Sequence, residues 1–272
     1  MIVRYAKEFY RFVKHIIQSR QLLFSLIKHD FEKQYLGSYF GFAWAFFEPL
    51  VFMLVIWFVF DVGFKSAPVA GGIPFYLWLM SGMIPWFFIS NGLSGGTSSV
   101  VSNTFLVKKV SFRVSILPLI SISSALVIHL FLVLFLIFAF LFSGLKPTIY
   151  WLQLPYYLLC SIILVLGLSW LTSSIRVFIK DIDNIIAVLL QIGFWATPVF
   201  WSLKSIPHKY QLIIKLNPAY YIIGGYRDTF INQIWFFDKP HLTIYFLSVA
   251  FIFLLLGAIV FKRLRPHFGD VL

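Results

Sequence analysis

The sequence predicts an all-α integral membrane protein with six membrane-spanning helices. Of its 272 residues, 60% are hydrophobic and only 12% are charged. An average globular protein is about 45 to 50% apolar and roughly 25% charged, so this chain lacks the polar residues to cover a water-soluble domain. Its apolar runs are continuous, whereas the strands of a membrane β-barrel alternate apolar and polar residues over about ten positions. The composition therefore excludes both a soluble domain and a barrel.

Six apolar stretches are long enough to cross the membrane. Crossing about 30 Å of hydrocarbon at 1.5 Å per helical residue requires ~20 residues. The predicted spans are Tyr39 to Phe60, Ile73 to Leu93, Val114 to Phe142, Tyr150 to Ile175, Ile185 to Leu203, and Leu242 to Phe261. Together with their connections they form one transmembrane domain over residues 39–272.

A seventh apolar run, Leu212 to Ile223, is too short to span. It also carries Lys215 and the helix-interrupting pair Asn217–Pro218. We expect the external segment 204–240 to contain short re-entrant helices that dip into the membrane or lie on it before the last span.

Residues 1–38 are predicted to form cytoplasmic amphipathic helices at the membrane interface. Tyr5, Phe9 and Phe12 recur at helical spacing, and basic residues occupy the other face. Such a helix lies in the inner-leaflet interface with its cations near lipid phosphates, and Arg4, Arg11 and Lys14 are the predicted headgroup contacts. The alternative is a helix that packs on a partner protein.

The distribution of positive charge predicts that both termini are cytoplasmic. Most of the 22 Lys and Arg residues lie on the side of the membrane that holds the termini, and the short connectors on the other side hold one each. This arrangement also accounts for the net charge of +12 without a nucleic-acid partner.

The sequence contains no recognisable energy source or catalytic motif. A phosphate-binding loop needs a lysine after its glycines, and Gly92 to Gly96 has none. Within the apolar runs, only Glu48 and His129 ionise readily. Glu48 is either a functional intramembrane carboxylate or a hydrogen-bonded packing residue, whereas His129 is predicted to form an interhelical hydrogen bond. We therefore predict no catalytic residue, no metal site and no cofactor bound by this chain.

A different class of function is suggested by Asp181-Ile182-Asp183. The D-x-D pattern occurs in metal-nucleotide sites of glycosyltransferases, so a membrane glycosyl or phosphoglycosyl transferase is one reading. In the other, the two acids pair with Arg176 and Lys180 or cap the next helix.

Several blocks of the sequence together resemble the membrane (permease) subunits of ATP-binding-cassette exporters that move O-antigen, capsule or teichoic acid. The first block is KHDFEKQYLGSYFGFAWAFFEPL, Lys28 to Leu50. The second combines Pro85-Trp86 with SNTFLVKKVSF, Ser102 to Phe112. The third runs from Arg176 through Thr197-Pro198-Val199 and Asn217-Pro218 to Tyr226-Arg227.

The resemblance implies partners that supply the missing motor. Members of the family work as a dimer of this subunit with two copies of a separate ATPase, which binds ATP and Mg. The cytoplasmic segment 95–112 would then be a coupling segment that docks on the ATPase, with Ser102, Asn103, Lys108 and Lys109 as candidate contacts. The alternative is a solvated connector. The resemblance also implies that the protein lies in a bacterial inner (plasma) membrane, where membrane lipids surround it.

The cargo that the resemblance implies is an undecaprenyl-type lipid-linked polysaccharide. Sugar rings present C–H faces that stack on aromatic side chains, so an aromatic channel can hold a glycan weakly and let it slide. The candidate channel residues are Trp44, Phe47, Glu48, Phe52, Trp86, Phe194 and Trp195. The alternatives are that these aromatics face lipid, or that an exporter of the same architecture carries a small molecule or a lipid.

Overall fold

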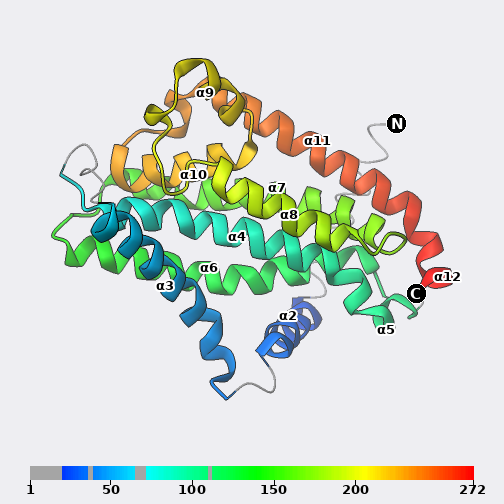
Figure 1. Cartoon of the computed structure of the whole chain (residues 1–272). Coiled ribbons are helices and arrows are strands. Elements are labelled where there is room, and N and C mark those ends of the chain that lie inside the picture. The colour runs from blue at the N-terminus through cyan, green and yellow to red at the C-terminus, as the bar shows by residue number, and fades with distance from the viewer. Residues whose placement is uncertain (1–19, 36–38, 65–71, 110–111) are drawn as a thin grey trace.

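A computed structural model describes residues 20–35, 39–64, 72–109 and 112–272, and every regular element in these ranges is helical (Figure 1). The α-helices are α2 (Arg20–Tyr35), α3 (Trp44–Trp57), α4 (Phe75–Ser102), α5 (Thr104–Val107), α6 (Leu117–Phe142), α7 (Leu154–Arg176), α8 (Ile182–Ala196), α9 (His208–Lys215), α10 (Pro218–Arg227), α11 (Pro240–Leu264) and α12 (Phe268–Val271). The predicted all-α class is confirmed for these residues.

Within the described residues, four helical segments are long and apolar enough to cross a membrane. They are Gly41–Gly63, Val114–Phe142, Ile149–Arg176 and Pro240–Val271, and they coincide with the predicted first, third, fourth and sixth spans. Helices made of continuous apolar residues satisfy their backbone hydrogen bonds internally, which lipid requires. The predicted second and fifth spans take other forms.

Helix α4 continues well beyond the apolar run that predicted it. The prediction ended at Leu93, whereas the helix ends at Ser102. Polar side chains of the second half hydrogen-bond within the helix and to its neighbour: the Thr97 hydroxyl donates to the Leu93 carbonyl oxygen at 2.8 Å and lies 2.7 Å from the Thr172 hydroxyl of α7. Small polar residues between helices allow this close packing.

Helix α8 is shorter than the predicted span Ile185 to Leu203. It ends at Ala196, and Thr197 is extended, with φ −86° and ψ 142°. Pro198 explains the end, because proline cannot donate a helical hydrogen bond and disfavours helical geometry in the residue before it. The 15 helical residues cover about 22 Å, less than the hydrocarbon thickness of ~30 Å.

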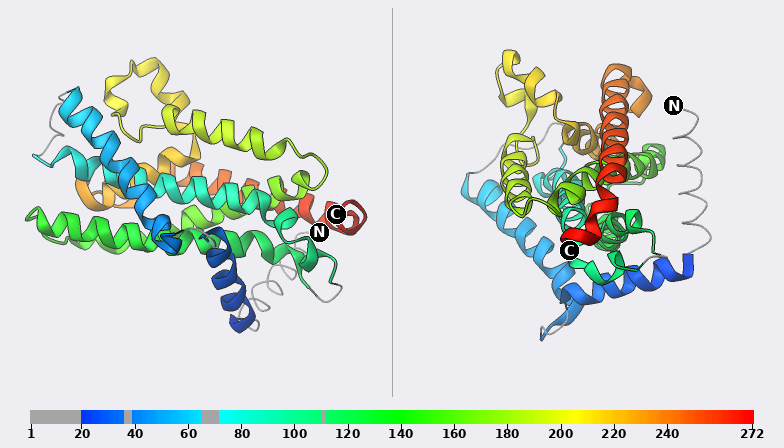
Figure 2. Two further views of the ribbon diagram at one scale, coloured as in Figure 1. Left: turned by 60° about the horizontal axis from the view of Figure 1, so that its bottom comes forward. Right: turned by 90° about the vertical axis from the view of Figure 1, so that its right-hand side faces the viewer.

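Helices α4, α6 and α7 lie side by side at the centre of the molecule (Figures 1 and 2). Helix α11 packs along α7, α8 lies against α4, and the short α10 packs between α4 and the start of α11. The α7–α11 crossing is close because it is made by two glycines: a Cβ on Gly257 would lie 2.2 Å from the Gly167 carbonyl oxygen.

Helix α3 leans away from this central group, and α2 crosses beneath α6 (Figure 2). Only one face of α3 is buried, with Ala45, Pro49 and Met53. Helix α2 is held by a hydrogen bond that the Ser124 hydroxyl donates to the Asp30 carboxylate at 2.7 Å. The buried core therefore belongs mainly to α4, α6, α7 and α10, with α3 and α8 at its edge.

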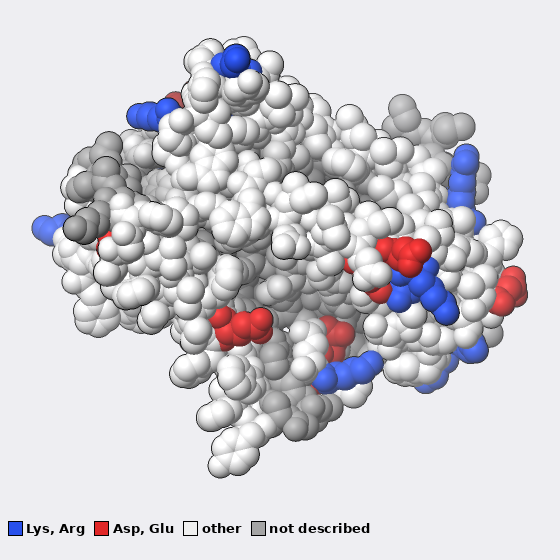
Figure 3. Space-filling view, viewed as in Figure 1, with Lys and Arg blue, Asp and Glu red and all other residues white. Residues whose placement is uncertain are grey.

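The two ends of the bundle carry different short elements. Helix α9 stands at one end, and α5, α12 and the C-terminus lie at the other (Figure 1). Most of the face drawn in Figure 3 is uncharged, with charged side chains in small groups toward its ends and lower edge. This distribution is typical of a helix bundle whose middle faces lipid.

Candidate functional site

Aromatic side chains from α3, α4 and α8 form one continuous cluster. The Phe194 ring lies 5.8 Å from Phe52 and 6.1 Å from Trp86, measured between ring centroids. Its neighbour Trp195 is 55% exposed, whereas Phe194 is only 8% exposed. We call this set the aromatic cluster; its members are Phe52, Phe60, Trp86, Phe87, Phe194, Trp195 and Phe200. The structure thus brings together four of the seven predicted channel residues.

The other three predicted channel residues lie on the same face of α3, nearer its start. Trp44, Phe47 and Glu48 are exposed, and Trp44 packs edge-on against Phe40 at 5.6 Å. Positions 44, 47, 48 and 52 follow helical spacing, so the four predicted α3 residues form one stripe, which ends at Phe52. Glu48 therefore lies on a solvent- or lipid-accessible face of this single chain.

A matching exposed stripe runs along α8. Its members are Ile185, Val188, Leu189, Ile192 and Trp195, which recur at helical spacing on the face turned away from α4. The two stripes flank the aromatic cluster, one on each side. A large apolar surface of this kind is covered by lipid or by another protein surface.

Three aromatic members of the cluster were not predicted. Phe87 follows Trp86 in α4, and Phe60 meets Phe200, which comes after the end of α8, at 5.1 Å. The Phe87 ring lies 6.0 Å from that of Phe52 in α3, a contact between helices that sequence spacing does not indicate. No sequence signal pairs Phe60 with Phe200, because their contact depends on the bend at Pro198.

A buried arginine connects α10, which lies in the predicted external segment, with α4. Arg227, at the end of α10, stacks its guanidinium carbon 3.6 Å from the centre of the Trp78 ring. Its Nη1 donates to the Pro198 carbonyl oxygen at 2.6 Å, and its Nη2 donates to the Val199 carbonyl oxygen. A planar guanidinium can form both bonds while it stacks on an aromatic ring.

Gly82 makes room for this arginine. A Cβ at Gly82 would lie 2.6 Å from Arg227 Nη2 and 2.6 Å from the Val199 carbonyl oxygen. Burial lowers the pKa of Arg227 to about 9, so the side chain still carries its charge at neutral pH. Tyr226-Arg227 was named within the third block of the resemblance, but no role was predicted for either residue. Trp78 and Gly82 were not predicted as site residues.

Asn217 provides a second connection at this end. Its Nδ2 donates to the Thr197 hydroxyl at 2.8 Å, and its Oδ1 accepts from the Ala219 backbone N–H at 3.0 Å. It therefore caps α10 and holds the extended residues after α8 at the same time. The predicted helix break at Asn217–Pro218 is confirmed, since α9 and α10 are separate helices.

Two further polar contacts fix α10 and the turn that follows it. Asp228 is buried, forms a salt bridge with Lys239 and accepts from Asn232 Nδ2 at 2.8 Å. His129 of α6 lies 2.7 Å from the Tyr226 hydroxyl through its Nε2, which confirms the predicted interhelical hydrogen bond. The end of the bundle that carries α10 is therefore an ordered, hydrogen-bonded assembly.

At the opposite end, the predicted coupling residues lie at the tip of α4 and just after it. The Asn103 Nδ2 donates to the Ser99 carbonyl oxygen at 2.9 Å, and the Ser102 carbonyl oxygen accepts from Lys33 Nζ of α2 at 3.3 Å. Lys108 and Lys109 are exposed beyond the short helix α5. Helix α2 and the coupling segment are thus in direct contact.

The D-x-D residues separate in the structure. Asp183 accepts from Arg176 Nε at 2.5 Å and from the Ser98 hydroxyl at 3.2 Å, while Asp181 is exposed. The predicted pairing with Arg176 is confirmed, and it ties α7, α8 and α4 together. No group of three or more possible metal ligands occurs within the described part of the chain.

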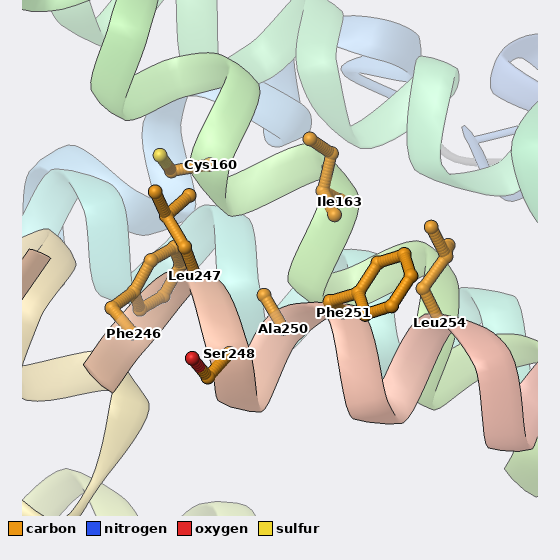
Figure 4. A pocket seen from close by; sticks show the side chains of 8 residues that line it. All are labelled: Cys160, Ile163, Phe246, Leu247, Ser248, Ala250, Phe251 and Leu254. Carbon is orange, nitrogen blue, oxygen red and sulfur yellow. The ribbon is translucent and has the colours of Figure 1, made fainter. Parts of the chain in front are cut away.

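The predicted headgroup contacts and one cavity remain to be placed. Arg4, Arg11 and Lys14 lie outside the described residues, so their headgroup contacts stay predictions. A cavity of about 450 Å³ between α7 and α11 contains none of the predicted site residues (Figure 4). Its lining is apolar except for the Ser248 hydroxyl and the Cys160 thiol.

The described part of the chain is thus a bundle of long apolar helices with an exposed aromatic face, which fits a membrane protein. Residues 21–231 match the ABC-2 type transporter family, so the chain belongs to that family.

Characterised relatives cover almost the whole chain. An O-antigen export system permease protein, RfbA, of Myxococcus xanthus is 29% identical over 265 residues, 96% of this chain and 98% of that protein. Two proteins of the same name in Klebsiella pneumoniae are 27% and 26% identical over 254 residues, 92% of this chain and 95% of each of those proteins.

Proposed function

We propose that this chain is the transmembrane subunit of an ATP-driven exporter that moves a lipid-linked, O-antigen-like polysaccharide from the cytoplasm outward. Membership of the ABC-2 type transporter family supports the transport role. The names of three relatives that align over at least 92% of this chain, all O-antigen export permeases, support the polysaccharide cargo. The working unit is a homodimer with two copies of a separate ATPase, which binds the ATP and Mg.

The proposed topology has six membrane passages and both termini in the cytoplasm of a bacterial inner membrane. Helix α4, 28 residues long, extends about 42 Å beside α6 and α7, which is enough to cross. The fifth passage consists of α8 and the extended residues after it. The excess of Lys and Arg on the side of the termini supports the orientation.

The observation that carries the proposal is the pair of exposed stripes on either side of the aromatic cluster. In a two-fold dimer the same surface of each copy meets its counterpart. If α3 and α8 of one copy face those of the other, the two aromatic clusters line one passage. Other outward faces, such as that of α11, are also apolar, but they do not have an aromatic cluster between two exposed helices. Such faces suit contact with lipid.

Aromatic walls suit a glycan. The C–H faces of pyranose rings pack on aromatic rings, and the hydroxyls stay solvated or hydrogen-bond transiently. Conduction requires contacts that are weak and repeated, so that the chain can enter and leave each one. Trp195 and Phe52 offer exposed rings for such contacts, backed by the buried Phe194 and Trp86.

Movement of the coupling segment is transmitted along α4. The ATPase would displace α5 and the tip of α4, where Ser102 contacts Lys33 of α2. The Ser98–Asp183–Arg176 contacts pass the displacement to α8 and α7. At the far end, Arg227 and Asn217 link α4 and the end of α8 to the external helices. A shift of α4 thus reaches the external mouth through packed and hydrogen-bonded groups.

The test is a matched pair of substitutions in cells that carry the chain with its ATPase. Ile192→Trp enlarges an α8 stripe residue that is 58% exposed, and Ile252→Trp enlarges an α11 residue that is 53% exposed. We expect Ile192→Trp to abolish surface polysaccharide, measured on intact cells, while the purified complex still hydrolyses ATP. Ile252→Trp should export normally. Normal export by Ile192→Trp, or equal loss in both variants, contradicts the proposed passage.

A further inference from the structure

A basic pocket lies at the end of the bundle that carries α5 and α12. Its volume is about 450 Å³, within the range of ligand-binding sites. Three cations line it: Lys109 after α5, Lys262 in the last turn of α11, and Arg265 in the turn that follows. None of the described residues that line it is acidic. The proposed coupling function uses Lys109 only as a contact to the ATPase and does not involve this pocket.

The rest of the pocket wall is apolar. Val107, Phe112 and Val114 come from the coupling segment and the start of the next span. The pocket thus joins two parts of the chain that lie about 150 residues apart in sequence. A mixed wall of this kind suits a ligand with an anionic head and an apolar body, rather than a free inorganic ion.

The C-terminal turn that forms one side of the pocket is held in place. Phe268 of α12 is buried, and its ring lies 5.4 Å from that of Phe261 and 6.1 Å from that of Phe178. These contacts fold the chain back after Leu264, so that Arg265 is held beside the coupling segment. The packing of Phe268 therefore fixes one side of the pocket.

The position of the pocket along α11 indicates its level in the membrane. Lys262 directly follows Phe261, where the apolar run of α11 ends. Cations at such a position lie at the level of the lipid headgroups. In the proposed orientation this is the cytoplasmic leaflet, whose anionic lipids attract basic residues near the membrane surface.

We infer that this pocket binds the phosphate headgroup of an anionic phospholipid of the cytoplasmic leaflet, with Lys109, Lys262 and Arg265 around the phosphate. The apolar wall receives the glycerol and the first methylenes of the acyl chains. The inference rests on the orientation in the proposed function, and it makes the coupling segment sensitive to the surrounding lipid, since one lipid would touch both that segment and the end of α11.

The test measures the thermal unfolding midpoint of the purified full-length chain in neutral detergent, with added phosphatidylglycerol or with phosphatidylcholine of the same acyl chains. A ligand that binds only the folded state raises the midpoint. We expect phosphatidylglycerol to raise it by about 3 °C or more above the value with phosphatidylcholine. Equal midpoints in the two lipids overturn the inference.

Two triple variants of equal charge locate the effect. Lys109→Gln, Lys262→Gln and Arg265→Gln together remove the pocket cations, and Lys28→Gln, Lys180→Gln and Arg263→Gln remove three exposed cations outside it. We expect phosphatidylglycerol binding to weaken on the order of a hundredfold in the pocket variant and to persist in the other. Equal weakening in both overturns the inference. If the pocket variant does not fold without lipid, Lys262→Gln alone replaces it, with a smaller loss expected.

A third ligand distinguishes the source of the phosphate. If undecaprenyl diphosphate stabilises the chain at far lower concentration than phosphatidylglycerol, and only the pocket variant loses this effect, the occupant is the cargo carrier and the phospholipid assignment is wrong. Weaker or equal stabilisation by undecaprenyl diphosphate supports it. Because none of these measurements uses export or ATP, their failure is separate from a failure of the proposed function.

Discussion

The guanidinium carbon of Arg227 lies 3.6 Å from the centre of the Trp78 ring, so a buried cation joins the short helix α10 to the central helix α4. The same side chain donates to two consecutive carbonyl oxygens, those of Pro198 and Val199, after α8 has ended. One residue therefore connects three segments at the external mouth of the proposed passage. Because α8 has ended, the carbonyl oxygens of Pro198 and Val199 have no helical donor, and Arg227 supplies one to each.

Replacing Arg227 by lysine is expected to destabilise the protein although the charge is kept. A lysine ammonium lacks the planar, forked donors of a guanidinium, so it cannot donate to both carbonyl oxygens while stacking on the Trp78 ring. The free energy of unfolding in detergent should fall by about 2 kcal/mol or more. Arg263→Lys, at an exposed position, provides the control and should change nothing measurable. Equal stability of the two variants speaks against the role given to Arg227.

Gly82 should tolerate no side chain, whereas Gly224 should. A Cβ at Gly82 meets Arg227 and the Val199 carbonyl oxygen at 2.6 Å, while one at Gly224 meets nothing within 4 Å. We expect Gly82→Ala to lower the unfolding midpoint clearly, because backbone must move. Gly224→Ala, inside α10, should leave it unchanged or raise stability by about 0.4 to 1 kcal/mol. The reverse order of the two variants contradicts the packing around Arg227.

The apolar runs alone located four helices well but misplaced two ends. Val114 to Phe142 was predicted with the bounds that the structure has for the whole helical segment. By contrast, α4 continues nine residues past Leu93, because its serines and threonines bond to helix carbonyls and to α7. Helix α8 ends at Ala196, whereas the predicted span continued to Leu203 because the apolar run continues past Pro198. The length of an apolar run indicates how much of a segment contacts lipid, but it does not give the length of the helix.

The two acids of the D-x-D pattern should differ in importance. Asp183 has partners on α7 and α4, whereas Asp181 is exposed. We expect Asp183→Asn to lower the free energy of unfolding by about 1 kcal/mol, since its salt bridge is only partly exposed. Asp181→Asn should have no effect on stability or export. A sugar-donor conversion by the purified chain that needs both acids would instead establish the transferase reading.

Helix α2 should detach from α6 when Ser124 loses its hydroxyl. Ser124 donates to Asp30 at 2.7 Å, and Ser123, beside it, donates only to the Leu119 carbonyl oxygen of its own helix. We expect Ser124→Val to accelerate trypsin cleavage after Lys28 and Lys33 of α2 severalfold, because a less firmly held helix opens more often. Ser123→Val should be cleaved like the wild type. Equal rates in the two variants contradict this docking contact.

The candidate site was predictable only in part, for a physical reason. Aromatic residues in apolar runs suggest a channel, and Phe52, Trp86, Phe194 and Trp195 do meet in one cluster. Arg227 could not be assigned its partner, because Trp78 lies about 150 residues away and the contact exists only once α10 folds back on α4. Long-range pairing of this kind leaves no local pattern in a single sequence.

In the proposed dimer, the α8 stripe of one copy faces that of a second copy. With Cys160, the only cysteine, changed to Ser, single cysteines are placed at Val188, Leu189 or Ile192 of α8, and at Phe251 or Ile252 of α11, all exposed. Membranes are then treated with a mild oxidant, and dimers are scored on non-reducing gels. A disulfide requires Cα atoms within about 7 Å. We expect a cross-linked dimer from at least one α8 position and none from α11. Cross-linking from α11 alone, or none from any α8 position, contradicts this arrangement of the dimer.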